Sequence, residues 1–556
     1  MKGEIFDYHR SAVAAPRKLY QGADAWYDRM LGWWERRPGR WKELETEAAL
    51  VEERRRSLED CSEEELDGHL REQRLRVLER GWKERKVLQE ALALSGEVMR
   101  REKGMTPHGV QMAGALAMSR GWLAEMATGE GKTLTVTLWA VVAGWRGRPC
   151  HIVTSNDYLA SRDAVEMAGV YGRCGLRVAA VTGEMDAEAR REAYGADLVY
   201  TTSKELLADF LKDRLVLGTQ AQADLRLVRC FSAPDKLVDG ELLQRGLHTA
   251  IVDEADNVLI DEAVIPLRIS QKYRNEGLRQ AYGAGSVLAR ECVLDEDYVV
   301  EKETRSVHLT RRGLERLDGW RPRLPLVWRG RRRGVELLEQ CLVAHVFFHR
   351  DKEYVVQEGK IVIVDGFSGR LMPDRSWSQG LHQAIEAKEG VEMSDPTETL
   401  ASLSFQKFFR LFRHLSGLSG TALEAAAEFW HIYRLPVLAI PTHLPKIRVE
   451  ERDRMVATLE EKWREVCGRV EQLHGQGKPV LVGTQNVAES ELLGKMLAER
   501  GLGFQLLNAV RFQAEAEIVA QAGGRGMITI ATNMAGRGTD IKLGEGCGSW
   551  GGFMCC

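Results

Sequence analysis

A glycine-rich loop between a short apolar strand and a long apolar helix is the feature that most limits what this chain can fold into. Residues 124–133 read AEMATGEGKT, follow the apolar pair Trp122 and Leu123, and lead into an apolar run over residues 134–145. Backbone N–H groups of such a loop, and of the helix that follows it, bind phosphate oxygens. The sequence therefore predicts a strand, a phosphate-binding loop and a helix in that order.

The side chains of the loop fit a nucleotide. Lys132 can neutralise the β- and γ-phosphates, and the Thr133 hydroxyl can ligate Mg²⁺. The usual pattern has glycine five residues before Gly131, where this chain has Met126, so the loop alone leaves open a segment that only resembles a nucleotide site. The residues predicted to bind ATP here are Thr128, Gly129, Glu130, Gly131, Lys132 and Thr133.

A second motif supplies the carboxylates that ATP hydrolysis needs. Residues 249–254 read TAIVDE, a short β-branched run that ends in Asp253 and Glu254. Such a strand brings one carboxylate to the magnesium ion and a second to the attacking water. The alternative is a strand followed by a solvated acidic turn. Because a phosphate loop precedes it in the same chain, the pair predicts an ATPase-type core.

Composition narrows the class of protein. A chain of 556 residues predicts roughly three or four domains. Its net charge of −3 gives no overall basic footprint for nucleic acid, and ten scattered cysteines favour reduced thiols in the cytoplasm. The first residues show no secretory signal, and the longest apolar stretch is too short to span a bilayer. We therefore expect a cytoplasmic protein whose membrane association, if any, is peripheral.

Hydrophobic periodicity divides the chain. Residues 1–100 have a helical pattern, with tryptophans predicted to anchor helix packing, and residues 107–264 alternate strands with helices, which predicts a parallel sheet. Residues 268–375 change to charged strands at 298–301, 354–356 and 361–365, typical of a separate domain with its own antiparallel sheet. The predicted strands of the alternating regions are 122–126, 151–154, 178–182, 197–201, 249–253, 437–440, 480–483, 504–507 and 527–531.

Further motifs follow in a fixed order. They are Val110-Gln111, HIVTSNDYLASRDA (151–164), DLVYTTSKELLADFLKD (197–213), IVDEADNVLIDEA (251–263), RSWSQGLHQAIEAKEG (375–390), TLASLSFQKFFRLF (399–412), LSGTA (418–422), PVLVGTQNVAESELL (479–493), LLNAVRFQAEAEIVAQAG (506–523) and ITIATNMAGRGTDIKLG (528–544). Together with the phosphate loop, their order and spacing resemble the SecA family of preprotein translocase ATPases over residues 100–544. Residues 1–100 resemble that family only in helical character.

The resemblance implies a fold and a domain plan. The fold is α/β, with two RecA-like P-loop motor domains (parallel sheets flanked by helices), an inserted α+β preprotein-binding domain and a helical N-terminus. The implied domains are a helical N-terminal region (1–100), a first RecA-like nucleotide-binding domain (101–267 plus 376–425), an inserted preprotein cross-linking or clamp domain (268–375) and an incomplete second RecA-like domain (426–556).

The resemblance also implies residue roles. Gln111 would read the adenine edge, the alternative being a surface glutamine on an amphipathic helix. Asp253 would organise Mg²⁺ together with Thr133, and Glu254 would be the general base or the carboxylate that orients the water. Residues 419–422 resemble a motif that couples the two motor domains; the alternative is a tight turn after a strand. Arg537 and Asp540 would contact the nucleotide from the second motor domain, the alternative being a structural Arg–Asp pair. The implied catalytic residues are thus Glu254, Asp253, Lys132 and Arg537.

The implied activity is ATP-driven protein export. In nucleic-acid helicases the coupling motif follows the carboxylate motif within a few dozen residues, whereas Glu254 and Ser419 here lie roughly 165 residues apart. The resemblance implies ATP and Mg²⁺ as cofactors. As partners it implies the SecYEG channel, unfolded preproteins and an anionic membrane surface, and no nucleic acid. The sequence does not indicate an oligomeric state.

Departures from the family leave an alternative function. A second arginine-rich motif of the type QLRGRxGRQGD, a helical scaffold, a helical wing and a two-helix finger are expected after residue 544, and the sequence given does not contain them. The alternative is therefore a truncated or non-catalytic SecA-like module that binds nucleotide and polypeptide without translocating. The final cysteines, Cys547, Cys555 and Cys556, offer three thiols without a nearby histidine, so no zinc is expected.

Overall fold

The computed structural model divides the chain into two compact units. One comprises Met1–Leu267 and Ser402–Cys556, and the other Arg268–Ala401. The residues that the structure describes are 19–20, 22–36, 39–218, 241–272, 276–350, 352–357, 359–364, 371–372, 377, 380–394, 397–446, 449, 451–507, 521–532, 541 and 554–555. Each unit is described by itself.

A seven-stranded, all-parallel sheet forms the centre of the first unit. Its strands, in spatial order, are β14 (Val437–Ala439), β1 (Leu123–Glu125), β13 (His414–Ser419), β5 (Thr249–Val252), β2 (Cys150–Thr154), β4 (Leu198–Thr202) and β3 (Val178–Val181). The central strands β5, β2 and β4 are buried along their whole length, as expected for a parallel sheet covered on both faces. The apolar runs thus form strands because helices shield both sides.

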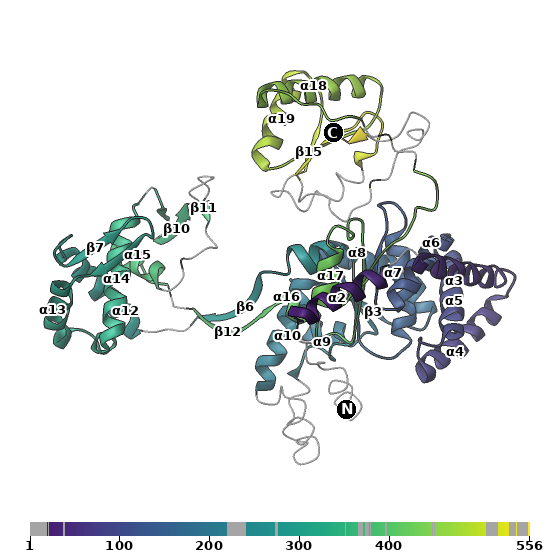
Figure 1. Ribbon diagram of the computed structural model, residues 1–556, viewed down its shortest axis with the longest axis horizontal. Coiled ribbons are helices and arrows are strands. Elements are labelled where there is room, and N and C mark those ends of the chain that lie inside the picture. The colour runs from purple at the N-terminus through teal and green to yellow at the C-terminus, as the bar shows by residue number, and fades with distance from the viewer. Residues whose placement is uncertain are drawn as a thin grey trace, which may run out of the picture. The chain divides into compact units, whose positions relative to one another are not determined.

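Helices cover this sheet. They are α6 (Gly109–Ser119), α7 (Lys132–Gly144), α8 (Asp157–Arg173), α9 (Ala187–Tyr194) and α10 (Ser203–Leu217), and in Figure 1 they surround the strands. Asn156, Asp186 and Thr202 cap α8, α9 and α10 with their side chains, which satisfies backbone donors at the helix starts. Helices α7, α8, α9 and α10 therefore each follow a strand of the sheet in the chain, whereas α6 precedes β1.

The N-terminal region forms four helices, and all but the first contribute residues to the hydrophobic core of this sheet. They are α2 (Gly22–Glu35), α3 (Gly39–Arg56), α4 (Glu63–Arg80) and α5 (Arg85–Lys103), and α3, α4 and α5 lie together in Figure 1. Leu44 and Leu92 share one buried cluster with Trp139 of α7 and Ile152 of β2. In contrast to the packing role predicted from the sequence, Trp26, Trp33 and Trp34 of α2 are mostly exposed.

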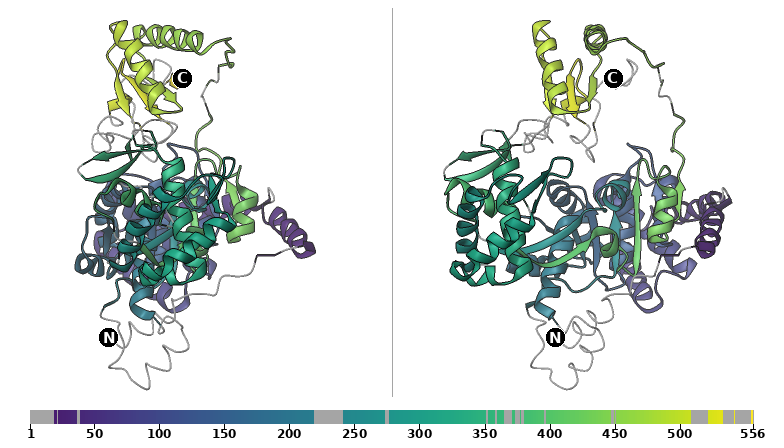
Figure 2. Two further views of the ribbon diagram at one scale, coloured as in Figure 1. Left: turned by 90° about the vertical axis from the view of Figure 1, so that its left-hand side faces the viewer. Right: turned by 60° about the vertical axis from the view of Figure 1, so that its left-hand side comes forward.

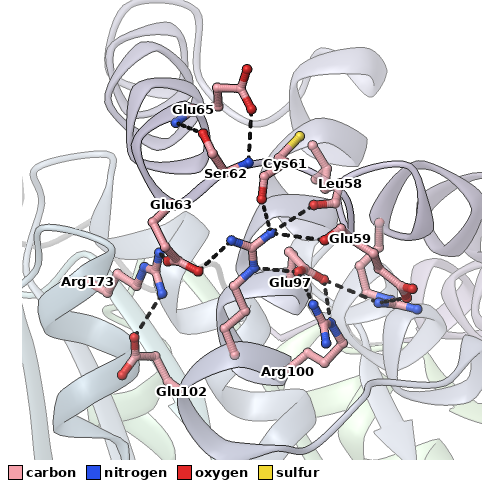
Figure 3. A network of polar contacts seen from close by, with 12 residues as sticks. Leu58, Glu59, Cys61, Ser62, Glu63, Glu65, Glu97, Arg100, Glu102 and Arg173 are labelled. Atoms are coloured by element: carbon pink, nitrogen blue, oxygen red, sulfur yellow. Dashed lines mark hydrogen bonds and ion pairs between the residues drawn. The ribbon is translucent and has the colours of Figure 1, made fainter.

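A buried carboxylate ties these helices together (Figure 3). Glu97 of α5 is fully buried and pairs with Arg55 of α3 and with its own neighbours Arg100 and Arg101. Arg101 also reaches Glu63 at the start of α4, and Glu63 in turn pairs with an arginine at the end of α8. Charged groups thereby join the N-terminal helices to each other and to a helix that covers the sheet.

The first sheet extends further along the chain than the sequence predicted. Strand β14 and helix α17 (Ala426–Tyr433) follow residue 425, where the first motor domain was expected to end, yet β14 pairs in parallel with β1. The predicted strand 437–440 is therefore an edge of the first sheet rather than the start of the second. Short apolar strands carry no sign of which sheet they join, because pairing partners are set by tertiary packing.

A second parallel sheet lies between residues 480 and 555. Its strands, in spatial order, are β16 (Gln505–Leu507), β17 (Ile528–Thr532), β15 (Val480–Thr484) and β18 (Met554–Cys555). Helices α18 (Leu459–Gly475) and α19 (Val487–Glu499) pack against it, as Figure 2 shows. Both motor domains are thus α/β and RecA-like, as predicted.

The second unit is an α+β domain with its own core. It contains α12 (Glu276–Glu291), β7 (Tyr298–Glu301), β8 (Ser306–Leu309), α13 (Arg311–Trp320), α14 (Arg331–Phe347), β9 (Tyr354–Gln357), β10 (Lys360–Val364), β11 (Leu371–Met372) and α15 (Leu381–Glu389). Strands β7 and β8 pair antiparallel, as do β9, β10 and β11. This confirms the predicted antiparallel strands.

The inserted unit also ends later than the sequence predicted. Ala384 and Ile385 of α15 are buried in one cluster with Tyr282 and Trp328, so the unit continues past residue 375. A two-stranded sheet of β6 (Pro266–Lys272) and β12 (Thr397–Ser404) lies where the chain enters and leaves the unit. Burial of α15, rather than the position of its sequence motif, decides its domain.

Two findings bear on location. Within the described ranges, no helix is both long and apolar enough to cross a membrane. Six cysteines in that part of the chain (Cys61, Cys150, Cys174, Cys292, Cys341 and Cys467) are thiols that form no disulfide.

Candidate nucleotide site

Three adjacent strands end at one place. Strand β13 lies between β1 and β5, with Gly417 paired to Leu123 on one side and to Val252 on the other. The phosphate loop follows β1, the carboxylate pair follows β5, and Ser419 ends β13. In parallel sheets, ligands bind beyond the carboxyl ends of the strands. The fold therefore gathers three sequence motifs, although the third lies far along the chain from the others.

Two glycines shape the phosphate loop. Gly129 and Gly131 have φ of 83° and 78°, the left-handed region that side chains disfavour. A Cβ atom at Gly129 would meet nothing within 4 Å, whereas one at Gly131 would lie 3.3 Å from Gln111 Nε2. Lys132 and Thr133 then open the 13-residue helix α7. The loop thus combines an open glycine backbone with a helix N-terminus, the arrangement that accommodates phosphate.

Lys132 contacts the predicted general base. Lys132 Nζ lies 3.0 Å from Glu254 Oε1, and both side chains are largely buried. Glu254 has φ of 48° although it is not glycine, a backbone conformation that costs about 1–3 kcal/mol and is typical of functional sites. The structure therefore brings Lys132 and Glu254 together, and phosphate oxygens would compete with Glu254 for the lysine.

Asp253 is held by the backbone. Its N–H donates to Val153 O at 2.8 Å, and its carboxylate accepts the Glu254 N–H at 2.9 Å. Burial of the carboxyl group, and then the charge of Glu254, raise the pKa of Asp253 to about 7. A carboxylate that loses water in this way is stabilised by a nearby cation. Oxygen donors from Asp253 and Thr133 fit the preferences of Mg²⁺, which keeps most of its coordination for water and phosphate. Among the described residues, no group of three or more His, Cys, Asp or Glu side chains is placed to hold a metal ion.

The motif at residues 419–422 contacts the carboxylate segment. Ser419 Oγ donates to Asp256 Oδ1 at 2.7 Å, and Thr421 Oγ1 donates to Asp256 Oδ2 at 2.5 Å. A Cβ atom on Gly420 would lie 3.4 Å from Lys132 Nζ. The motif therefore touches both the carboxylate segment and the phosphate-loop lysine. The sequence analysis missed Asp256, although its place three residues after Asp253 was a usable signal.

Gln111 lies beside the phosphate loop and bonds its backbone. Gln111 Nε2 donates to Glu130 O at 2.8 Å, and Gln111 Oε1 accepts the His108 N–H at 2.7 Å. The side chain is buried, so the alternative of a surface glutamine does not hold. In this structure both ends of the amide hold the chain itself, and contact with adenine stays a prediction.

Two histidines beside Gln111 were not anticipated. The rings of His108 and His443 are parallel within 8°, with centroids 3.9 Å apart. The His443 backbone N–H donates to Glu130 Oε2 at 3.0 Å. Both histidines are exposed, and neither position carries a sequence pattern that would have identified it.

The predicted site residues not yet placed are Thr128, Arg537 and Asp540. Thr128 is exposed and lies near Gly420. Arg537 and Asp540 lie outside the described residues, as do Cys547 and Cys556 and the side chain of Cys555.

Comparison with known proteins gives a consistent result. A family model described as the SecA DEAD-like domain matches residues 29–430, and one described as the SecA P-loop domain matches residues 445–549. The match thus begins well before residue 100, where the resemblance had been placed. Proteins named protein translocase subunit SecA 2 from Magnetococcus marinus and Chlorobium chlorochromatii are 43% and 42% identical, over 98% of this chain and 84% and 82% of theirs. A protein translocase subunit SecA from Clostridium beijerinckii is 41% identical over 84% of this chain and 52% of its own length.

Proposed function

This chain belongs to the SecA family, and we propose on that basis that it hydrolyses ATP to drive unfolded preproteins across a membrane through the SecYEG channel. The observation that carries the ATPase part is the meeting of Lys132, Asp253 and Glu254 at the ends of β1 and β5. The translocation part is supported by the names of the relatives and by the compact unit inserted between β5 and β13.

The geometry suggests how the residues act. Bound ATP would supply the phosphate oxygens that draw Lys132 away from Glu254, and Asp253 and Thr133 would hold the Mg²⁺ that accompanies it. Glu254, released from the lysine, can then accept the proton of the attacking water. We propose that Arg537 and Asp540 complete the site from the second motor domain.

The hydrogen bonds from Ser419 and Thr421 to Asp256 connect the nucleotide site to a second segment of the chain. These bonds join the segment after β5 to the segment after β13, and the inserted unit lies between those two strands in the chain. We propose that a change at Glu254 is passed through Asp256 to the two segments of the chain that lead to and from the insertion. We propose that the insertion holds extended polypeptide by adding it as a strand, a mode that does not read sequence.

Replacing Lys132 with alanine is expected to weaken Mg·ATP binding about ten- to a hundredfold, since a charged hydrogen bond contributes about 1.5–3 kcal/mol. A fluorescent-nucleotide titration measures this effect. Lys495→Ala on α19 is the matched control, because it removes an exposed lysine from a helix that holds none of the predicted site. Equal affinity of Lys132→Ala and the parent would overturn the assignment of the loop.

Unfolded polypeptide, rather than RNA, is expected to stimulate ATP turnover. The net charge of −3 offers no dominant field for phosphate polymers. The assay compares phosphate release with an unfolded secretory precursor and with single-stranded RNA, at the same ionic strength. Stimulation by RNA alone would contradict the proposed substrate class.

A further inference from the structure

An acidic residue stands inside the loop where a polyanion is proposed to bind. Glu130 lies between Gly129 and Gly131, so Coulomb repulsion between its carboxylate and a triphosphate opposes binding. In the structure this carboxylate is bonded by the backbone N–H of His443, with 3.0 Å between N and Oε2. A group from outside the loop thus fixes the position of the charge.

Four residues form a closed set of contacts, which we call the His443 circuit: Glu130, Gln111, His108 and His443. Glu130 O accepts from Gln111, and Gln111 accepts from the His108 backbone. The His108 ring stacks on the His443 ring, and the His443 N–H returns to the Glu130 carboxylate. The circuit therefore holds both the backbone and the side chain of Glu130.

The chain around His443 is itself fixed. Ile440 N donates to Glu125 O at 2.9 Å, which anchors the segment to the end of β1. Prolines at 441 and 445 restrict the backbone on either side, and Thr442 Oγ1 donates to Leu444 O at 2.7 Å. A donor on such a constrained turn loses little freedom when it binds a carboxylate, which makes the contact effective although it is exposed.

We propose that the His443 backbone N–H is a positioning group for the phosphate loop, which holds the Glu130 carboxylate on the His443 side so that the loop can take a nucleoside triphosphate. This inference rests on the proposed function, because it assumes that the loop binds ATP. It assigns His443 to the nucleotide site. It also means that the effect of the Glu130 carboxylate on binding affinity should be larger for a more highly charged nucleotide.

Two substitutions of Glu130 separate the effect of its charge from the effect of its side-chain length. Glu130→Asp keeps the charge but shortens the side chain, so the carboxylate no longer reaches His443. We expect ATP binding to weaken about fivefold, the size of one unscreened charge near the ligand. Glu130→Gln keeps the length and removes the charge, so ATP binding should tighten severalfold. Isothermal titration with ATP and with ADP measures both, and the Asp variant should lose more affinity for ATP than for ADP.

Variants of His443 test the donor itself. His443→Pro removes the N–H, and ATP binding should weaken as it does in Glu130→Asp. The double variant His443→Pro/Glu130→Gln should recover ATP affinity, because no carboxylate then needs to be held. His443→Ala removes the ring stack but keeps the donor, so its loss should be smaller than that of the proline variant. Glu188→Gln, an exposed position on α9, controls for the change in net charge.

Failure of the proposed function and failure of this inference alone would give different results. If the parent binds neither ATP nor ADP, the proposed function fails and the inference fails with it. If the parent binds nucleotide but Glu130→Asp and Glu130→Gln shift affinity in the same direction, or ATP and ADP equally, the inference alone is overturned. The inference is also overturned if the double variant has the melting temperature of the parent but does not recover its ATP affinity.

Discussion

Replacing Glu254 with glutamine is expected to lower the rate of ATP turnover by about 10²–10⁴-fold, the usual contribution of a positioned general base. The glutamine amide keeps the shape of the side chain but cannot accept the proton of water. The same change removes the negative charge from the group that holds Lys132 at 3.0 Å. Nucleotide affinity should therefore be retained or increase, because Lys132 no longer has to leave an ion pair to bind phosphate.

Phosphate release and nucleotide titration must be measured on the same preparation to test this prediction. Glu262→Gln is the matched control, since Glu262 lies eight residues further along, is exposed and contacts Asn257 rather than the lysine. Hydrolysis by Glu254→Gln at the parent rate would exclude Glu254 as the base. A fall in both turnover and affinity would instead indicate that Glu254 supports the loop.

Removing the Glu97 carboxylate is expected to cause the largest loss of stability, about 3–5 kcal/mol. Arg55 and Arg101 then lose their shared buried partner and keep only the more exposed carboxylates of Glu59 and Glu63. Burial raises the pKa of Glu97, but hydrogen bonds from Arg100 and Arg101 outweigh it and hold that pKa below its usual value. A carboxyl group of this kind stabilises the fold above its unfolded-state pKa. That contribution is lost as the pH falls through the folded-state pKa.

Urea unfolding of Glu97→Ala against the parent measures the free-energy change. Glu102→Ala is the control, because Glu102 is one-third exposed and pairs only with Arg173 among the described contacts; its loss should stay below about 1 kcal/mol. Equal losses for the two variants would show that the buried network contributes no more than a surface pair.

Local sequence patterns predicted the helices and strands better than they predicted which strands pair and which domain each element joins. Most strands of both sheets could be predicted because each is a short apolar run between turns, but β13 and β18 were not among the predicted strands. The placement of β14 beside β1 could not be predicted, because parallel pairing joins segments far apart in the chain. The same holds for the N-terminal helices, whose membership of the first domain depends on contacts such as Glu63 with Arg173. The extent of the inserted unit likewise depends on the burial of Ile385.

The candidate site was likewise predicted only in part: its residue types could be found from the sequence, but their contacts could not. Lys132, Asp253 and Glu254 could be found from sequence because phosphate and water chemistry demand those residue types after strands. The ion pair between Lys132 and Glu254 could not be predicted, because the motifs indicate what each residue does toward ATP and not that the two side chains contact each other. His443 gave no signal, because it acts through a backbone donor that every residue except proline possesses.

The order of strands in the first sheet also fixes an order of events during synthesis. Strand β1 pairs only with β13 and β14 in the described sheet, and both are translated after the whole inserted unit. Domains generally fold as units while the chain emerges from the ribosome. The strand that carries the phosphate loop therefore stays unpaired until β13, which ends at Ser419, has been made, while the insertion can already be folded. A nascent chain released before that point would hold a finished insertion and a sheet in which β5 lacks its neighbour β13.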